Sequence, residues 1–394
     1  MKKFLFVLAL LCLIMATCYS ITKQELETLR VLIERMEKDQ TNIVFKGNGI
    51  SLRYSTYTFP TIYQGGFTLA NQLTIITLNP ILKFYYDHMY DSVNTIENYK
   101  DLMLLSSEDL LYKDRRYRGK FLIVPENGYY LLINLVSMED YLRAVVPSEM
   151  PSSWHMEALK AQAIAARTYA IRVAIERRKK QQIFDLYSTV LDQAYYGKDK
   201  ETSRTDQAVL ETKDLIILYD NQPIWALYHS NCGGHTLDGR LVFKNRIESS
   251  QDYLSSTDCP YQGKKWNLEI EIYNLAQILQ KVTKNKVYSI ENVYTNSFKT
   301  YIVYNQGVVY SLYNWELRKM IGYSKIRSPY FTHTVLRGGN VLFEGVGFGH
   351  GVGMCQFGAN ELAKRGFTYK EIVKYYYKNV EITEIGRWLE NANI

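Results

Sequence analysis

Residues 147–170 read PSEMPSSWHMEALKAQAIAARTYA. The second half of this stretch is rich in Ala, Leu, Lys, Gln and Arg, which have high helix propensity, so the sequence predicts a helix that continues to about Lys180. Ser153 is the predicted N-cap of this helix, and Pro151 helps to define its start. One acid, Glu149, lies between two prolines directly before the predicted helix.

Glu149 is the first candidate for chemistry. Its neighbours Pro147, Met150, Pro151 and Trp154 are stiff and apolar, and desolvation raises the pKa of a carboxyl group. A general acid that cleaves a glycosidic bond must hold its proton near neutral pH. A position just before a helix N-terminus has the opposite effect, because it stabilises the charged form by about 0.3–1 kcal/mol. A capping or surface acid is the alternative.

Composition indicates a globular, exported protein. The 394 residues are 47% hydrophobic and 22% charged, enough to bury one core or two, and the net charge of +7 is spread along the chain without a sign of nucleic-acid readout. Residues 1–20 have the layout of an export signal, so the periplasm or cell envelope is the expected location. Residues 15–18, MATC, resemble a degenerate lipoprotein cleavage box, and a mature form with a lipid at its N-terminus is the alternative to a soluble mature form.

The hydrophobic pattern indicates an α+β protein with mixed strands and helices. Apolar residues at near-helical spacing predict a short amphipathic helix over residues 22–39. Short runs rich in Tyr, Thr, Ile and Val predict strands from 42 to about 136, with a helix as an alternative over 95–112. Asn127-Gly128 predicts a hairpin within 117–136. Further helices are expected near 273–284 and 312–321.

The expected regions are a signal (1–20), a smaller N-terminal helix and β-rich region (21–115), a catalytic domain (116–385) and a tail (386–394).

A glycine-rich stretch near the C-terminus is the second candidate site. Glycines alternate from Gly345 to Gly353, which lets backbone amides approach a ligand closely, and two short amphipathic helices follow. The stretch lacks the Lys-Ser/Thr ending and the strand-helix unit of phosphate-binding loops. His350 and Gln356 are instead candidates to bind sugar hydroxyl or acetamido groups. A tightly packed structural turn is the alternative.

Three cysteines follow the signal, and two of them form the third candidate site. The motif YHSNCGGHTLDG contains His229, Cys232 and His235, and Cys259 lies downstream. Two imidazoles and two thiolates can close a tetrahedral structural zinc site. A disulfide between Cys232 and Cys259, or free thiols, are the alternatives. The sequence lacks the H-E-x-x-H pattern of one class of zinc peptidase.

The third cysteine allows a different enzyme class. His350 and Cys355 are the residue types of a cysteine hydrolase, in which the histidine activates a thiolate nucleophile. Nothing near Cys355 specifies a nucleophile at a helix start.

Together, five stretches resemble the stage II sporulation protein D family, also called the LytB-related domain of cell-wall enzymes. They are YRGKFLIV, LVSMEDYLRAVVPSEMPSSWHMEALKAQAIAARTYAI, YYG, YHSNCGGHT and GFGHGVGMCQFGANELAKRGFTYKEIVKYYYKNVEI, and they run in the family's order from about 117 to 383. The resemblance implies that Glu149 is the catalytic acid. It also implies a set of substrate-binding positions: Arg167, Tyr196, His229, Ser230, His350, Gly351, Met354 and Gln356. Cys355 departs from the family pattern, where serine is usual, which makes a nucleophilic thiol less plausible.

The activity that this resemblance implies is lytic transglycosylation of peptidoglycan glycan strands, after an N-acetylmuramoyl-L-alanine amidase has removed the stem peptides. Glu149 would protonate the leaving oxygen and then accept the proton of the C6 hydroxyl, which gives a 1,6-anhydro-N-acetylmuramic acid end. Intramolecular attack needs no second carboxylate and no cofactor. The alternative is a glycan-binding scaffold without turnover that recruits an amidase or another wall enzyme.

Overall fold

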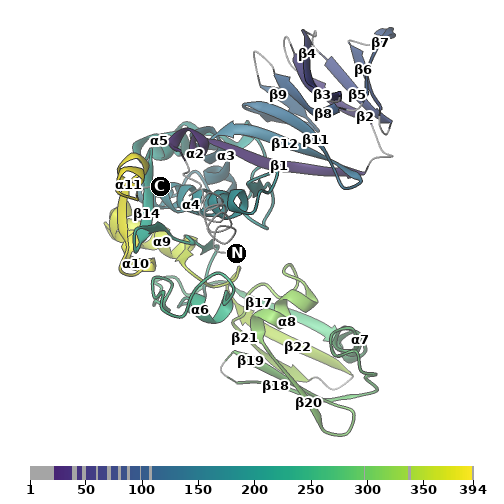
Figure 1. The fold of residues 1–394 in the computed structure, drawn as a ribbon. Helices are drawn as coiled ribbons and strands as arrows, with labels where there is room; N and C mark the ends of the chain where they lie inside the picture. Colours follow the sequence, from purple (N-terminus) through teal and green to yellow (C-terminus); the bar gives the residue numbers. More distant parts are fainter. Residues whose placement is uncertain are drawn as a thin grey trace, which may run out of the picture.

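The computed structural model describes residues 22–37, 42–46, 50–58, 61–68, 72–78, 81–86, 89–97, 99–105, 109–296, 298–335 and 339–392. It confirms the predicted α+β class, with a helical body flanked by two β-rich parts (Figure 1). The predicted export signal, 1–20, lies outside the described residues. None of the helices within these ranges is long and apolar enough to cross a membrane.

The first β-rich part is built on the predicted hairpin. β11 (Lys120–Glu126) and β12 (Tyr129–Ser137) pair antiparallel, and both turn residues have positive φ, 42° at Asn127 and 91° at Gly128. Positive φ at both positions matches the twist of the flanking strands, so the Asn-Gly prediction is confirmed. These strands belong to a seven-stranded sheet with the order β13-β1-β12-β11-β8-β3-β4.

The predicted helix over 22–39 is mostly wrong. Only α2 (Lys23–Glu27) is helical, and β1 (Thr28–Glu37) is a strand. β1 pairs with the whole of β12 and, in parallel, with the short β13 (Leu186–Tyr187). Pairing on both edges buries Leu29 and Val31, and this tertiary gain outweighs the helical spacing of the apolar residues.

The remaining N-terminal elements are strands. Their bounds are β2 (Asn42–Lys46), β3 (Ser51–Thr58), β4 (Thr61–Thr68), β5 (Gln72–Leu78), β6 (Ile81–Tyr86), β7 (Met89–Glu97), β8 (Tyr99–Leu105), β9 (Leu110–Tyr112) and β10 (Arg115–Tyr117). β10, β9, β2, β5, β6 and β7 form a six-stranded sheet in that order. The alternative helix over 95–112 is therefore wrong.

The helical body surrounds one central helix, α4 (Met156–Lys179), which confirms the predicted helix. Its N-cap is His155 and not Ser153, because the imidazole Nδ1 accepts the amide hydrogen of Glu157. Alanines on several sides of α4 are fully buried, and small side chains let its neighbours approach closely. Those neighbours are α3 (Met138–Glu149), α5 (Ser203–Glu211), α9 (Gln356–Lys364), α10 (Tyr369–Tyr376) and β14 (Leu215–Tyr219).

Short elements complete the body. A 3-10 helix (Lys198–Lys200) and α6 (Gly239–Val242) lie in connections, and β15 (Gln222–Pro223), β14 and β24 (Glu381–Glu384) form a small sheet. β16 (Tyr228–His229) pairs in parallel with β23 (Met354–Cys355). The expected tail, 386–394, lies mostly in a helix, α11 (Ile385–Ala392), in which Trp388 is buried.

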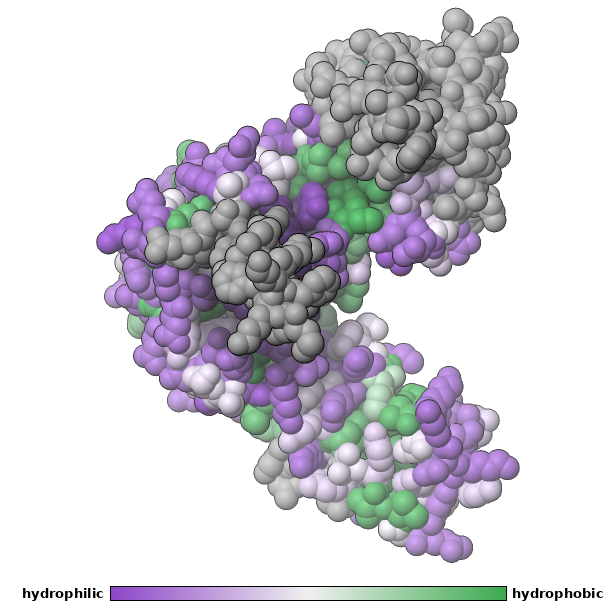
Figure 2. Space-filling view, viewed as in Figure 1, coloured by the Kyte–Doolittle hydropathy of each residue, from purple (hydrophilic) through white to green (hydrophobic). Residues whose placement is uncertain are grey.

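A second β-rich part is inserted between Cys259 and the glycine-rich stretch and has its own hydrophobic core. It contains β17 (Lys265–Glu271), α7 (Ile272–Thr283), β18 (Ile290–Asn296), β19 (Lys299–Tyr304), β20 (Val308–Tyr313), α8 (Asn314–Ile321), β21 (Phe331–Val335) and β22 (Asn340–Val346). The helices α7 and α8 confirm two predictions. In the space-filling view the surface is hollowed between the end of the β11–β12 hairpin and this inserted part (Figure 2).

Candidate functional site

Glu149 is the last residue of α3 and does not precede α4 directly. Six residues separate it from the first residue of α4. The C-terminal end of a helix carries partial negative charge, so this position disfavours a carboxylate. The sequence predicted that a helix N-terminus would stabilise the Glu149 carboxylate. The C-terminus of α3 instead destabilises it.

Three neutral groups surround the Glu149 carboxyl. The backbone N–H of Ala194 donates to Oε1 at 2.8 Å, and the side chains of Gln356 and Tyr228 also hydrogen-bond to the carboxyl. Burial raises the pKa of Glu149 above its ordinary value, although these three hydrogen bonds act to lower it. None of the ion pairs formed by the described residues includes Glu149.

The contact with Ala194 favours one position for the proton. A backbone N–H can only donate, so Oε1 accepts. The carbonyl oxygen is the better acceptor of a neutral carboxyl group, so we assign the carbonyl to Oε1 and the proton to Oε2. Oε2 is then the oxygen that can exchange a proton.

The parallel pairing of β16 with β23 brings Tyr228 and Gln356 together. Tyr228 lies opposite Met354 in the register, and Gln356 follows β23 as the first residue of α9. Gly353 has φ +71°, and a Cβ at this position would collide with the carbonyl oxygen of Leu227. Its missing side chain therefore allows the two strands to approach, which is the structural role of at least this part of the glycine-rich stretch.

His350 stabilises the position of Tyr228 through hydrogen bonds to two backbone groups. Its Nδ1 accepts the amide hydrogen of Val352 at 3.1 Å, so Nε2 carries the hydrogen and donates to the carbonyl of Tyr228 at 2.9 Å. Burial lowers the pKa of His350 well below its ordinary value, so the ring is neutral. Both ring nitrogens are thus engaged with backbone groups, and His350 positions Tyr228, whose hydroxyl reaches Glu149.

Two glutamines that the sequence did not single out, Gln193 and Gln162, support the residues that contact Glu149. Gln193 donates to the hydroxyl of Tyr228 at 2.9 Å and accepts from the hydroxyl of Tyr141 at 2.9 Å. Gln162 of α4 accepts from Gln356 at 3.4 Å. Gln193 directly precedes Ala194, so one short segment provides two supports for the acid. Residues 193 and 194 directly precede the YYG motif, and this position in the sequence could have indicated their role.

Arg167 lies elsewhere. Its guanidinium is fully buried and forms a bidentate ion pair with Glu139 of α3, at 2.9 and 2.8 Å. It also donates to the backbone carbonyls of Leu215 and Val209, at 3.2 and 3.4 Å. These contacts join α4 to α3, α5 and β14. Arg167 therefore holds the helical body together and is not placed beside Glu149.

The other predicted substrate-binding residues are partly engaged within the protein. The ring of Tyr196 lies beneath Arg115 and Lys200, at 4.8 and 5.3 Å. The carbonyl of Ser230 accepts the amide hydrogen of Phe357 at 3.1 Å. Met354 is fully buried, and Gly351 has φ +81° next to the ring of Tyr330.

Three thiols and one imidazole converge next to this site. Ligand atoms of His229, Cys232 and Cys355 all lie within 4.8 Å of one another. The thiol of Cys259 hydrogen-bonds to those of Cys232 and Cys355, and all three cysteines are buried and free. The predicted ligand His235 does not belong to this cluster, because its side chain is exposed and packs against Tyr330. Cys355 occupies the place expected for His235.

The buried cluster also argues against a cysteine hydrolase. Cys355 is fully buried and caps α9 by accepting the amide hydrogen of Gly358 at 3.3 Å. Burial raises the pKa of its thiol well above the ordinary value. His350, the required activating base, donates to Tyr228 instead. A nucleophilic thiolate needs exposure, which Cys355 lacks, and His350, the predicted base, is engaged with backbone groups instead.

Comparison with known proteins identifies the family. Residues 126–219 match the family model described as stage II sporulation protein. An uncharacterised protein of Brachyspira hyodysenteriae is 33% identical over 75% of this chain and 80% of the relative. Stage II sporulation protein D of Bacillus subtilis is 31% identical over 64% of this chain and 76% of the relative. A Bacillus subtilis protein named amidase enhancer is 29% identical over 61% of this chain and 40% of its own length. On this evidence the chain belongs to the stage II sporulation protein D family.

Proposed function

We propose that this protein acts on the bacterial cell wall as a lytic transglycosylase, which cleaves glycan strands denuded of stem peptides. The observation that carries the proposal is Glu149, a carboxyl group without an ion-pair partner among the described residues and with a raised pKa. Its surroundings supply the property that a general acid requires. Membership of the family supports the choice of substrate.

The mechanism uses this carboxyl group twice. Oε2 of Glu149 donates its proton to the oxygen that bridges C1 of N-acetylmuramic acid to the next sugar, and the C1–oxygen bond breaks. The C6 hydroxyl of the same sugar then bonds to C1, and Oε2 takes up the hydroxyl proton. The product is a 1,6-anhydro end, and Glu149 returns to its acid form without a second carboxylate.

The environment of Glu149 serves both steps. Burial favours the neutral acid that must donate, while the donors Ala194, Tyr228 and Gln356 favour the carboxylate that must accept. Each pKa unit corresponds to about 1.4 kcal/mol between the two forms, so a balance of these effects keeps both proton transfers accessible. A salt bridge to Glu149 would instead fix the carboxylate and prevent the first step.

The proposal includes an exported protein in the cell envelope that acts together with an amidase. The relative named amidase enhancer supports the association with an amidase. An N-acetylmuramoyl-L-alanine amidase would act first and supply the denuded strands.

Product analysis tests the proposed reaction. Incubation of the protein with purified denuded strands is expected to release sugars with anhydro ends, because the C6 hydroxyl and not water attacks C1. Mass spectrometry of the soluble products distinguishes the outcomes, since hydrolysis gives products that are one water heavier. Retention of the protein on the strands without soluble sugar would instead support the scaffold.

We also propose a structural zinc ion at the thiol cluster. His229 donates from Nδ1 to the carbonyl of Val352 at 3.0 Å, which leaves Nε2 buried without a partner. An imidazole oriented by its second nitrogen is typical of a zinc ligand. Cys232 and Cys355 lie with it within 4.8 Å, and Cys259, which hydrogen-bonds to both thiols, would complete a Cys₃His set of the kind that suits tetrahedral zinc. The ion would fix the strand pair that carries Tyr228 and Gln356.

Metal content tests this site. We expect about one zinc ion per chain in the purified protein, and its loss in a Cys259→Ser variant with a Tm lower by about 10 °C or more, because structural zinc contributes directly to folding. Elemental analysis and thermal unfolding measure both effects. His235→Ala is the matched control and should keep the zinc. A protein without zinc in which Cys232 and Cys259 form a disulfide would contradict the assignment.

A further inference from the structure

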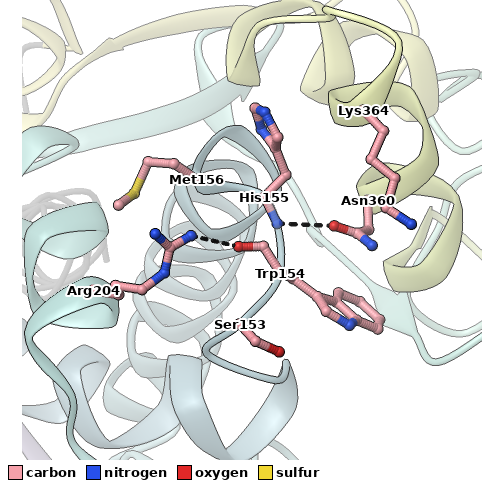
Figure 3. A pocket seen from close by; sticks show the side chains of 7 residues that line it. All are labelled: Ser153, Trp154, His155, Met156, Arg204, Asn360 and Lys364. Atoms are coloured by element: carbon pink, nitrogen blue, oxygen red, sulfur yellow. Dashed lines mark hydrogen bonds between the residues drawn. The ribbon is translucent and has the colours of Figure 1, made fainter.

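A surface cavity of about 630 Å³ lies at the start of α4, and Glu149 does not line it. Its lining residues come from the loop before α4, from the first residue of α4, from α5 and from α9, and Figure 3 shows their side chains. They are Ser153, Trp154, His155, Met156, Arg204, Asn360 and Lys364. Two of these side chains are permanent cations, and none is an acid. The cavity therefore has the charge of a site for an anionic group.

Arg204 brings positive charge that the cavity does not neutralise. Its guanidinium donates to the backbone carbonyls of Ser152 and Trp154, at 3.0 and 2.8 Å. Within the described part of the chain it forms no ion pair with a carboxylate. Lys364 adds a second charge at the opposite wall, where it is shared with the partly exposed Glu361. An incoming carboxylate would therefore gain Coulomb attraction from both sides.

Asn360 adds a directed donor. It is only 5% exposed, and its Oδ1 accepts the amide hydrogen of His155 at 2.9 Å, as Figure 3 shows. Because that hydrogen bond requires an oxygen, the other terminal atom of the side chain must be the amide nitrogen. Nδ2 has no hydrogen-bond partner among the described residues, although the side chain is buried and lines the cavity. Nδ2 is therefore free to donate a hydrogen bond to a group that enters the cavity.

Aromatic rings connect the cavity to the proposed catalytic site. Trp154 of the cavity packs edge-on against Phe357 with ring centroids 4.7 Å apart, and Phe357 stacks on Tyr261 at 4.6 Å. Phe357 directly follows Gln356, which contacts Glu149. Aromatic surfaces of this kind suit the apolar faces of sugar rings. Trp154 of the cavity thus contacts Phe357, the chain neighbour of Gln356, and Gln356 hydrogen-bonds to Glu149.

Denuded strands carry the matching group. When an amidase cleaves the bond between the lactyl group and the stem peptide, the lactyl carbonyl changes from a neutral amide to a carboxylate. Each denuded N-acetylmuramic acid therefore has one negative charge close to its ring. In a peptide-bearing sugar the same position is neutral and is followed by a bulky chain.

We propose that the cavity lined by Arg204, Asn360 and Lys364 binds the lactyl carboxylate of an N-acetylmuramic acid residue near the scissile bond. This inference rests on the proposed glycan substrate. It explains how the protein selects strands that an amidase has already processed. Selection depends on the charge of the lactyl group, because an amide at that position would present an N–H donor to a wall of donors and cations.

Binding measurements on the full chain test this assignment. The Glu149→Gln protein is used as the background, so that turnover does not remove the ligand. Its affinity is measured for denuded strands, for denuded strands whose lactyl carboxylates have been converted to primary amides, and for peptide-bearing strands. We expect denuded strands to bind about tenfold more tightly than amidated strands, and added salt to reduce this difference.

Substitutions of Lys364 and Arg204 test whether these two cations cause the preference for strands with lactyl carboxylates. Lys364→Gln should weaken the binding of denuded strands several-fold and leave amidated strands unchanged, and Arg204→Gln should do the same. Lys364→Gln keeps the loop that Arg204 supports, so it remains informative if Arg204→Gln disturbs folding. Lys281→Gln on α7 is the matched control and should change neither affinity. Equal affinity for carboxylate and amide strands, or equal losses for both in the variants, would overturn the assignment. Because no readout needs cleavage, failure of the lytic reaction alone would not affect it.

Discussion

Replacement of Glu149 by glutamine is expected to lower the rate of anhydro-sugar release by about 10⁴-fold, the upper end of what general acid–base catalysis contributes. Glutamine keeps the shape and can still accept the Ala194 amide hydrogen, so the local structure should survive. It cannot donate a proton to the bridging oxygen or accept one from the C6 hydroxyl. Both steps therefore fail together. The measurement is the initial rate of product release from denuded strands, followed by mass spectrometry.

A matched acid on the same body provides the control. Glu176 pairs with Arg172 along the exposed side of α4, at 3.1 Å, so Glu176→Gln should retain nearly full activity. Glu149→Gln should also keep the Tm and the strand affinity of the wild-type protein, because the change removes chemistry and not binding. A Glu149→Gln protein that still releases anhydro sugars would refute the mechanism.

The pH profile reports on the same proton. Because burial raises the pKa of Glu149, its acid form persists above pH 4.5, the ordinary pKa of a glutamic acid. The reaction begins from the acid form, so kcat/KM should fall tenfold per pH unit once the pH exceeds the raised pKa. Removing a donor by Tyr228→Phe should move this limb to higher pH, because that hydrogen bond stabilises the carboxylate.

Local patterns predicted the elements that depend on nearby residues. The Asn127-Gly128 turn and the helix α4 follow from turn chemistry and propensity within a few residues. Residues 28–37 have the apolar spacing of a helix, yet they form β1 because β12, about a hundred residues away in the chain, offers a complete antiparallel partner. Pairing of this kind is not written into the local pattern.

In the candidate site, too, local features could be predicted from the sequence and long-range contacts could not. Glu149 stood out because of its two flanking prolines, but Pro147 lies inside the last turn of α3, a helix that the sequence did not predict. The donors Tyr228 and Ala194 were missed because their contacts with the acid depend on strands and loops that meet only in the folded chain. The thiol cluster illustrates this most clearly, since Cys355 joins Cys232 only through the pairing of β16 with β23. The sequence therefore placed the fourth ligand on the nearby His235.

Arg167 provides the second large effect, and it is expected in stability and not in substrate affinity. Arg167→Met should lower the free energy of unfolding by about 3 kcal/mol, because it leaves Glu139 without its bidentate partner and two backbone carbonyls without donors. The side chain of Glu139 is 26% exposed, so water can recover part of the loss. Urea denaturation of the full chain measures the change.

The partner residue separates the two roles of Arg167. If its function is to join the helices, the Arg167→Met, Glu139→Gln double variant should be more stable than the sum of the single changes implies, because no unpaired charge remains. The folded fraction of each variant should bind denuded strands with the wild-type affinity. A variant that unfolds like the wild-type protein but binds strands weakly would instead assign Arg167 to the substrate. Its complete burial behind Glu139 predicts the first result, since a glycan strand cannot reach the guanidinium without opening the contact between α3 and α4.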